Sequence, residues 1–274
     1  MYKTKIFFGK TFDEDNLFQI DIEDNFHTML SKRDDEVLNI VVVGAWHGDE
    51  IQSFLRLENT HIWAFEPNPI NFSYLSKRYS SNPHVTCFDF ACGENEGVVP
   101  LYEANLTGND SLLPIRDGAH IQIKKVHMVD VKRLDSIKEI QNIKIDLLWV
   151  DAQGYELPII KGSTTILKNI QSMFLEINVG DDTYAGATQA SDLEKFLDTN
   201  GFNIAYRGVG NDFFLRKDIN SDFFSNEDIY NKRITASLER RIKMIRFANS
   251  PFYRWLSILI PSKLRAVIKR IFNI

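Results

Sequence analysis

Residues 40–50 read IVVVGAWHGDE, and this stretch decides which fold the chain is expected to adopt. A run of β-branched residues leads into a turn between Gly44 and Gly48, and the acidic pair that follows suits the first turn of a helix. A turn of this kind brings a ligand close to the backbone, at the positive end of the helix. The stretch therefore predicts a nucleotide-like ligand beside the first strand of a parallel sheet.

The rest of the body alternates β-rich runs with helical patterns. This alternation predicts an α/β fold of the Rossmann type, with a doubly wound, mainly parallel sheet. Strands are predicted at 37–43, 61–66, 85–90, 145–150 and 172–178, and helices at 49–57, 69–79, 157–168 and 190–199. Two final strands at 202–207 and 212–216 flank the hairpin signal GVGN, which makes the last strand antiparallel. A polar insertion over 97–135 is expected to add edge strands at 98–102 and 121–131.

Length and composition suit one large globular domain, since the chain has 274 residues of which 44% are hydrophobic. We expect this domain over 37–218, an N-terminal cap segment over 1–36 and a helical extension over 219–274. Cys87 and Cys92 suit buried, reduced thiols rather than a metal site or a disulfide. Because the sequence shows neither a signal peptide nor a run of about 18 apolar residues, a cytoplasmic protein is expected.

The charge of the chain is concentrated at its end. Residues 240–274 contain nine Lys or Arg and no acid, and the whole chain has a net charge of −5, so subtracting nine leaves −14 for residues 1–239. Aromatic and aliphatic residues lie among these cations at 252–260. The pattern predicts a helix on an anionic membrane surface, at the inner membrane face. It also fits a helix that docks on the domain or forms an oligomer contact, whereas nucleic-acid binding is not expected.

Two acidic residues follow the second and third predicted strands. Glu66, before Pro67, can accept both hydrogen bonds of a ribose diol. Asp89 can accept from an adenine amino group, and Phe90 can stack on the ring. NAD and S-adenosylmethionine both offer such groups, but the turn lacks the middle glycine of the dinucleotide motif and carries Trp46 nearby, which favours S-adenosylmethionine.

A third acid, Asp151, follows the fourth strand in the sequence DAQGYE (151–156). Methyl transfer to a hydroxyl requires alignment of the acceptor and a group that removes its proton. Asp151 is the first candidate for this base, and Glu156 and Glu176 are alternates. A helix cap or a bond to the cofactor amino group would suit Asp151 equally well, and the sequence leaves these roles open.

Polar side chains in three loops are candidates for an acceptor cleft that suits a sugar. We expect substrate contacts from Asn109, Ser111, Gln153, Glu176, Asn178 and Tyr184. Turn chemistry would explain the loop residues as well. The six histidines show no metal-ligand spacing, so no metal site is expected.

Taken together, these motifs resemble the FkbM-type S-adenosylmethionine-dependent methyltransferases over roughly residues 38–206. The matching segments are VGA (43–45) with Gly48, AFEPNP (64–69), ACG (91–93), NDSLL (109–113), VKRLD (131–135) and DAQGYELPIIKG (151–162). The resemblance implies that Asp89 lies near adenine and that Asp151 and Glu156 face the reaction site. It also implies a sugar hydroxyl as the acceptor. The full set expected to line the cofactor is Gly44, Ala45, Trp46, Gly48, Glu66, Pro67, Asp89, Phe90 and Asp151.

Four residues depart from the family pattern. Val42 and Trp46 stand where Asp and Asn are usual, and Trp149 and Gln153 stand where Lys and Glu are frequent. Because two of these positions are expected to flank the methionine end of the cofactor, its carboxylate and ammonium must be held differently here.

We therefore expect an O-methyltransferase that acts on a saccharide or glycoconjugate, peripheral to the inner membrane face. An NAD-dependent sugar-modifying enzyme is the second hypothesis, and binding of NAD without S-adenosylmethionine would favour it. A non-catalytic scaffold derived from a methyltransferase is the third, and it would bind the cofactor weakly or not at all.

Overall fold

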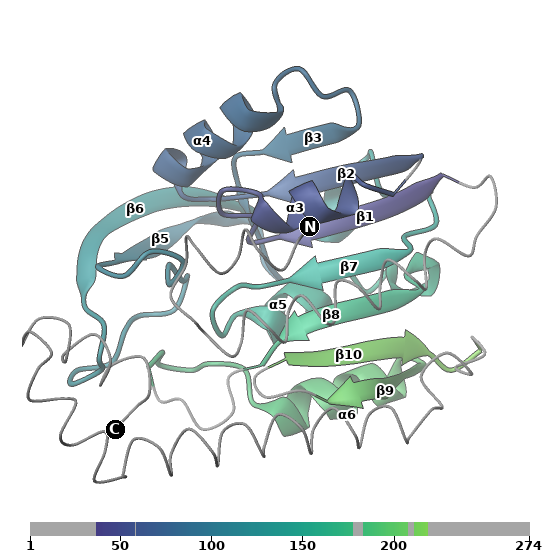
Figure 1. Ribbon diagram of the computed structural model, residues 1–274. Helices are drawn as coiled ribbons and strands as arrows, with labels where there is room; N and C mark the ends of the chain where they lie inside the picture. The colour runs from purple at the N-terminus through teal and green to yellow at the C-terminus, as the bar shows by residue number, and fades with distance from the viewer. Residues whose placement is uncertain (1–36, 58, 178–182, 208–210, 219–274) are drawn as a thin grey trace, which may run out of the picture. The chain divides into compact units, whose positions relative to one another are not determined.

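The computed structural model describes residues 37–57, 59–177, 183–207 and 211–218 (Figure 1). The predicted cap segment 1–36, the extension 219–274 and Asn178 lie outside the described residues. Among the helices that the structure describes, none has the length and apolar character needed to cross a membrane.

A seven-stranded sheet forms the centre of the fold, in the order β3-β2-β1-β7-β8-β10-β9 (Figure 1). Its strands are β1 (Leu38–Val43), β2 (Thr60–Phe65), β3 (Val85–Phe88), β7 (Leu147–Val150), β8 (Ser172–Glu176), β9 (Phe202–Arg207) and β10 (Asn211–Arg216). The first five of these strands pair in parallel, whereas β10 runs antiparallel to both β8 and β9. The predicted doubly wound sheet with an antiparallel last strand is confirmed.

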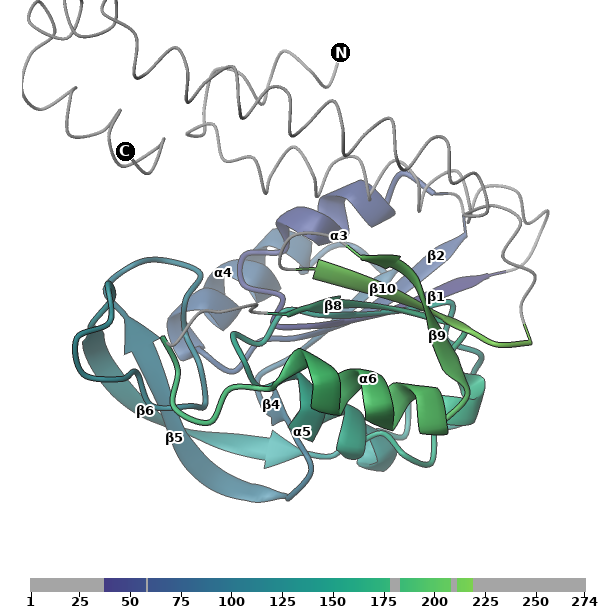
Figure 2. The same cartoon turned by 90° about the horizontal axis from the view of Figure 1, so that it is seen from below.

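Helices cover both faces of the sheet (Figure 2). Figure 2 shows α3 (Asp49–Phe54) and α4 (Pro69–Tyr79) on one face, and α5 (Glu156–Lys161) and α6 (Ala190–Thr199) on the other. The residue before α4, Asn68, caps the helix: its side-chain oxygen accepts the backbone N–H of Ile70 at 2.9 Å. The helices α4 and α6 have the predicted bounds, because helical periodicity is a local signal.

The predicted helix 157–168 is wrong in its second half. The helix α5 ends at Lys161, and only a 3₁₀ turn at Leu167–Asn169 follows. The next residue, Gly162, meets the chain at Gly93, where a Cβ on Gly162 would lie 2.1 Å from the Gly93 carbonyl oxygen. The helix therefore stops where its backbone touches the loop after β4.

The insertion forms a sheet of its own rather than edge strands of the main sheet. This second sheet contains β4 (Ala91–Cys92), which precedes the insertion, together with β5 (Gly97–Ala104) and β6 (Ile123–Lys132). Its strand order is β4-β6-β5. The expectation of additional edge strands is wrong because β3 ends at Phe88 and the chain then turns into β4, which pairs with β6. Figure 1 shows β5 and β6 beyond the carboxyl ends of the parallel strands, where a ligand of this fold would bind.

Two departures from the family pattern meet in the core. Val42 on β1 and Trp149 on β7 are partners in the parallel register, and both are buried. The Trp149 ring stacks on Phe174 with centroids 3.8 Å apart and meets the edge of Phe54 at 5.7 Å. Val42 therefore fills the interior of the sheet and is not among the residues that line the cavity described below.

The turn after β1 depends on a single glycine. Gly44 has a φ of 80°, in the left-handed region, and its N–H donates to the Phe65 carbonyl at 3.0 Å. A Cβ at this position would lie 1.7 Å from the backbone carbonyl oxygen of Asp151. Only glycine lets the ends of β1, β2 and β7 approach so closely.

We predict that Gly44→Ala destabilises the fold much more than Gly186→Ala. Both residues have a φ of 80°, but a Cβ on Gly186 would meet nothing within 4 Å. Gly186→Ala should cost only backbone strain, about 1–2 kcal/mol, whereas Gly44→Ala adds a backbone clash and should cost more than about 3 kcal/mol. Urea unfolding of both variants measures the two losses, and equal losses would contradict the close approach.

Candidate active site

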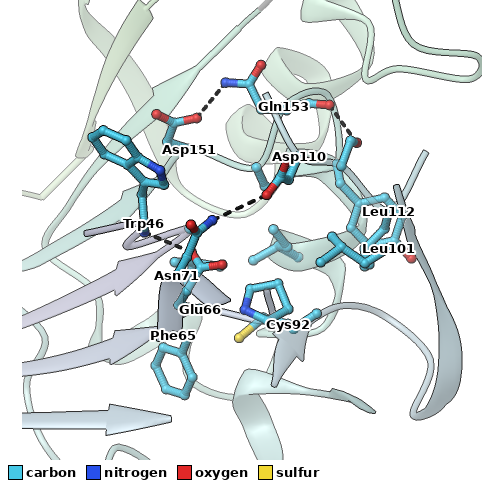
Figure 3. Close-up of a pocket in the computed structure, with 18 of the residues that line it drawn as sticks. Trp46, Phe65, Glu66, Asn71, Cys92, Leu101, Asp110, Leu112, Asp151 and Gln153 are labelled. Atoms are coloured by element: carbon cyan, nitrogen blue, oxygen red, sulfur yellow. Dashed lines mark hydrogen bonds between the residues drawn. The ribbon is translucent and has the colours of Figure 1, made fainter. Parts of the chain in front are cut away.

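A cavity opens at the carboxyl ends of the parallel strands, under the inserted sheet (Figure 3). Its walls come from the ends of β1, β2 and β7, from α4 and from the insertion. The lining residues are Val43, Gly44, Trp46, Glu50, Phe65, Glu66, Pro67, Asn71, Phe90, Ala91, Cys92, Leu101, Gly108, Asp110, Ser111, Leu112, Asp151, Ala152, Gln153, Tyr155 and Ile159. The cavity thus collects side chains from distant parts of the sequence at the edge where the sequence predicted a ligand.

Two of the predicted glycine-turn residues support the cavity without lining it. Ala45 is fully buried, and its N–H donates to the Phe65 carbonyl at 3.0 Å. Gly48 has a φ of 74°, and a Cβ there would lie 2.6 Å from the Tyr79 ring on α4. Gly44 and Trp46 are the residues of this turn that face the cavity.

Glu66 is the most buried carboxylate of the cavity wall, with 5% of its surface exposed. Its Oε2 accepts the backbone N–H of Trp46 and its Oε1 accepts that of Asn68, both at 2.8 Å. Burial raises the pKa of Glu66 to about 7, and the nearby Asp110 carboxylate adds to the rise. The Asn71 side chain also hydrogen-bonds to this carboxylate, which retains acceptor capacity for a hydroxyl group of a ligand.

Asp110 is a lining residue that the site prediction omitted, although both of its neighbours were included. Its Oδ2 accepts from the side-chain amide of Asn71 at 3.2 Å (Figure 3). The same oxygen accepts from the Asn68 amide at 2.7 Å, and Oδ1 accepts the N–H of Ala104 at 2.9 Å. These bonds tie the insertion to the start of α4. No local pattern signals them, because Asn68 and Asp110 lie far apart in the sequence.

Asp151 follows β7 and lines the cavity, half-buried. Its backbone N–H donates to the Val43 carbonyl at 3.0 Å, which fixes the residue at the end of the sheet. Its Oδ1 accepts from the Gln153 side-chain amide at 2.9 Å (Figure 3). The Asp151 carboxylate thus lies at the cavity, and its hydrogen bond with Gln153 orients it.

Gln153 also gathers two of the other expected substrate residues. Its amide nitrogen donates to Glu176 Oε2 at 2.7 Å. The Tyr184 hydroxyl shares its single proton between the Asn109 backbone carbonyl at 2.8 Å and Gln153 Oε1 at 3.2 Å. Glu176, Tyr184 and Asn109 thus surround Gln153 and lie outside the cavity lining, whereas Gln153 lines it.

Glu156 does not face the reaction site, contrary to what the resemblance implied. It is 1% exposed, and its Oε1 accepts the backbone N–H groups of Gly154 at 3.0 Å and Ala152 at 3.3 Å. Burial raises the pKa of this carboxyl to about 7. Its position makes it a support for the turn after β7 rather than a group that reaches a substrate.

Of the residues that were predicted to contact the cofactor, some line the cavity and others do not. Phe90 and Pro67 line the cavity, and the Phe90 ring lies 5.5 Å from that of Phe65. Asp89 is exposed and does not line the cavity. From the insertion, Ser111 lines the cavity and its hydroxyl donates to the Gln153 backbone carbonyl at 2.9 Å.

Comparison with known proteins gives relatives that are less than 30% identical to this chain. The 2-O-methyltransferase NoeI of Sinorhizobium fredii is 23% identical over 205 residues, which is 69% of this chain and 82% of the relative. The hexuronic acid methyltransferase AglP of Haloferax volcanii is 24% identical over 123 residues, which is 44% of this chain and 49% of AglP.

A solved structure of similar architecture is the magnesium protoporphyrin IX methyltransferase ChlM of Synechocystis PCC 6803, with bound S-adenosylmethionine. It has a TM-score of 0.42 and 11% identity over 72% of this chain and 78% of ChlM.

A family model described as the methyltransferase FkbM domain matches residues 42–204. The match covers more than half of the chain. It includes Gly44, Glu66 and Asp151, which follow the strands β1, β2 and β7 and line the cavity. The chain therefore belongs to the FkbM family and is a methyltransferase that depends on S-adenosylmethionine.

Proposed function

We propose that this methyltransferase modifies a hydroxyl group of a saccharide or glycoconjugate. The names of two relatives support a sugar acceptor, since one is a 2-O-methyltransferase and the other acts on a hexuronic acid. The observation that carries the proposal is the Asp151 carboxylate, which lines the same cavity as the buried Glu66. One acid is thus available to hold the cofactor and another to receive a proton.

The residues of the cavity fit the cofactor. Gly44 and Trp46 line the cavity at the turn after β1, and Glu66 offers a buried acceptor carboxylate to the ribose hydroxyls. When bound, S-adenosylmethionine supplies a methyl carbon on a positive sulfur, so that a new carbon–oxygen bond replaces the carbon–sulfur bond, whose electrons stay on sulfur.

Asp151 is proposed as the general base. The attacking oxygen must lose its hydroxyl proton, and the carboxylate can accept it at Oδ2, since Oδ1 already accepts from Gln153. The protonated Asp151 then releases the proton to water. The Gly44 and Phe65 contacts fix the strand end that carries Asp151, which aligns the base with the cofactor pocket.

We predict that binding of S-adenosylhomocysteine weakens as the pH falls below about 7. The ribose requires the ionised form of Glu66, whose raised pKa lies at about 7, so affinity should fall by up to roughly tenfold per pH unit below that value. Calorimetric titration between about pH 5.5 and 8 measures the effect.

Glu66→Gln should lower the affinity at least about tenfold at pH 8 and remove the pH dependence. The exposed Glu139→Gln is the matched control and should behave like the unmodified protein. A parallel titration with NAD should show no binding. Pronounced binding of NAD without S-adenosylhomocysteine would refute the cofactor assignment.

We predict that Asp151→Asn reduces methyl transfer by about 10²–10⁴-fold and changes S-adenosylhomocysteine affinity by less than about twofold, because an amide cannot accept the proton. The measurement is S-adenosylhomocysteine release with a panel of soluble saccharides as acceptors. The exposed Asp130→Asn serves as the control. Unchanged turnover in Asp151→Asn would remove this residue from the base role.

We also propose that residues 240–274 bind an anionic membrane surface, because they carry nine cations among aromatic and aliphatic residues. The full chain should co-sediment with vesicles that contain phosphatidylglycerol and not with pure phosphatidylcholine vesicles. A variant that ends at residue 239 should remain in the supernatant. Equal sedimentation of both proteins would rule out the tail as the membrane contact.

A further inference from the structure

We infer that the acceptor is an uncharged sugar or an amino sugar, because the site repels a carboxylate or phosphate on the ring that receives the methyl group. The inference rests on the proposed function, in which a saccharide hydroxyl approaches Asp151, and it narrows the class of saccharide. It distinguishes this chain from AglP, whose name specifies a hexuronic acid.

The first observation is the charge of the cavity wall. The charged residues that line the cavity are Glu50, Glu66, Asp110 and Asp151, and Figure 3 shows the last three around one space. Among the lining residues that the structure describes, none is Lys, Arg or His. Because a concave site with charges of one sign concentrates their field, this wall repels anions more strongly than a flat surface would.

The second observation is that the hydrogen-bond donors on three of these acids are uncharged groups. Asp110 accepts from two side-chain amides and one backbone N–H group, and Glu66 accepts from two backbone N–H groups. Asp151 accepts from the Gln153 amide. Such bonds stabilise a carboxylate and leave its charge in place. The charge of Asp110 already acts on its neighbour, since it contributes to the raised pKa of Glu66.

The third observation is that two cations close to the cavity have partners of their own. Arg78 on α4 donates to the His47 carbonyl at 2.8 Å and to the Asp49 carboxylate at 2.7 Å. The Lys132 ammonium lies over the Phe90 ring, 4.1 Å from its centroid. Neither Arg78 nor Lys132 lines the cavity. An anionic sugar would therefore meet the acids without a positively charged group in the described wall.

The sequence shows the same bias around the site. The segments that follow the parallel strands are residues 44–50, 66–72, 89–96, 151–157 and 177–187. Each contains at least one acid, and none contains Lys or Arg. A ligand of this fold binds beyond the carboxyl ends of the strands, from which these segments continue. Recognition of a phosphate or carboxylate typically uses Arg or Lys, and these segments supply neither.

The bound methyl donor does not reverse this balance. S-adenosylmethionine combines a sulfonium and an ammonium with one carboxylate, so it adds one net positive charge to a wall of four acids. A carboxylate on a sugar ring whose hydroxyl reaches Asp151 lies within the Debye length of about 8 Å at physiological salt, so the repulsion is only partly screened. We expect kcat/KM to be at least about tenfold lower for such an acceptor.

The experiment compares acceptors that differ only at C6, namely a methyl glycoside, the corresponding uronate and the corresponding 6-amino-6-deoxy sugar. The gluco, galacto and manno series are tested with the full chain and S-adenosylmethionine at pH 8, and S-adenosylhomocysteine release gives kcat/KM. The neutral and amino acceptors should exceed the uronate by at least about tenfold. NMR locates the new methyl group, and a series charged at another carbon replaces the first if the methyl group is on O6.

Two further measurements identify charge as the cause. Raising NaCl from about 0.02 M to about 0.3 M should narrow the gap between the neutral acceptor and the uronate, because salt screens the repulsion. Glu50→Gln removes one charge of the wall and should narrow the gap at least about twofold. The exposed Glu139→Gln is the matched control and should leave the gap unchanged.

The outcomes separate this inference from the proposed function. A uronate that reacts as well as the neutral acceptor overturns the inference. Equal rejection of the uronate and the amino sugar also overturns it, since the size of the C6 group rather than its charge would then decide. If S-adenosylhomocysteine binds but no saccharide of any series reacts, the proposed function fails and the inference fails with it.

Discussion

The site depends on the close approach of the ends of β1, β2 and β7 at Gly44. The backbone of this residue faces the Asp151 carbonyl at a distance that leaves no room for a side chain, and its N–H reaches across to the Phe65 carbonyl of β2. The turn can then present the Trp46 N–H to Glu66. One steric constraint therefore sets the spacing of Glu66, the proposed cofactor ligand, and Asp151, the proposed base.

Two departures from the family pattern are neighbours in the register of β1 and β7. Position 42 usually carries Asp and position 149 often carries Lys, and here the two positions are neighbours on adjacent strands. Opposite charges there could neutralise each other. Val42 and Trp149 replace such a pair with apolar contacts, and Phe54 and Phe174 pack on the indole. Exchange of a buried ion pair for apolar packing need not reduce stability. Neither Val42 nor Trp149 lines the cavity.

The insertion contributes more than a cover for the cavity. Asp110 ties it to the start of α4, beside Glu66, and Ser111 ties it to the turn at Gln153, beside Asp151. Adjacent residues of one segment thus contact both halves of the site. The two acids, Glu66 and Asp151, are held in place by bonds that converge from separate elements, which is how a preorganised site keeps its geometry before the substrate arrives.

The sequence alone determined how strands and helices alternate along the chain, because periodicity, caps and glycine turns are local signals. It also determined which acids follow three of the strands. It therefore placed Gly44, Glu66 and Asp151 at one edge of a parallel sheet. Only the tertiary structure decided that the insertion forms a separate sheet and that Glu156 supports a turn. It also decided that Gln153 joins Asp151 to Glu176. These outcomes depend on pairing and contact between distant segments, which residue spacing does not specify.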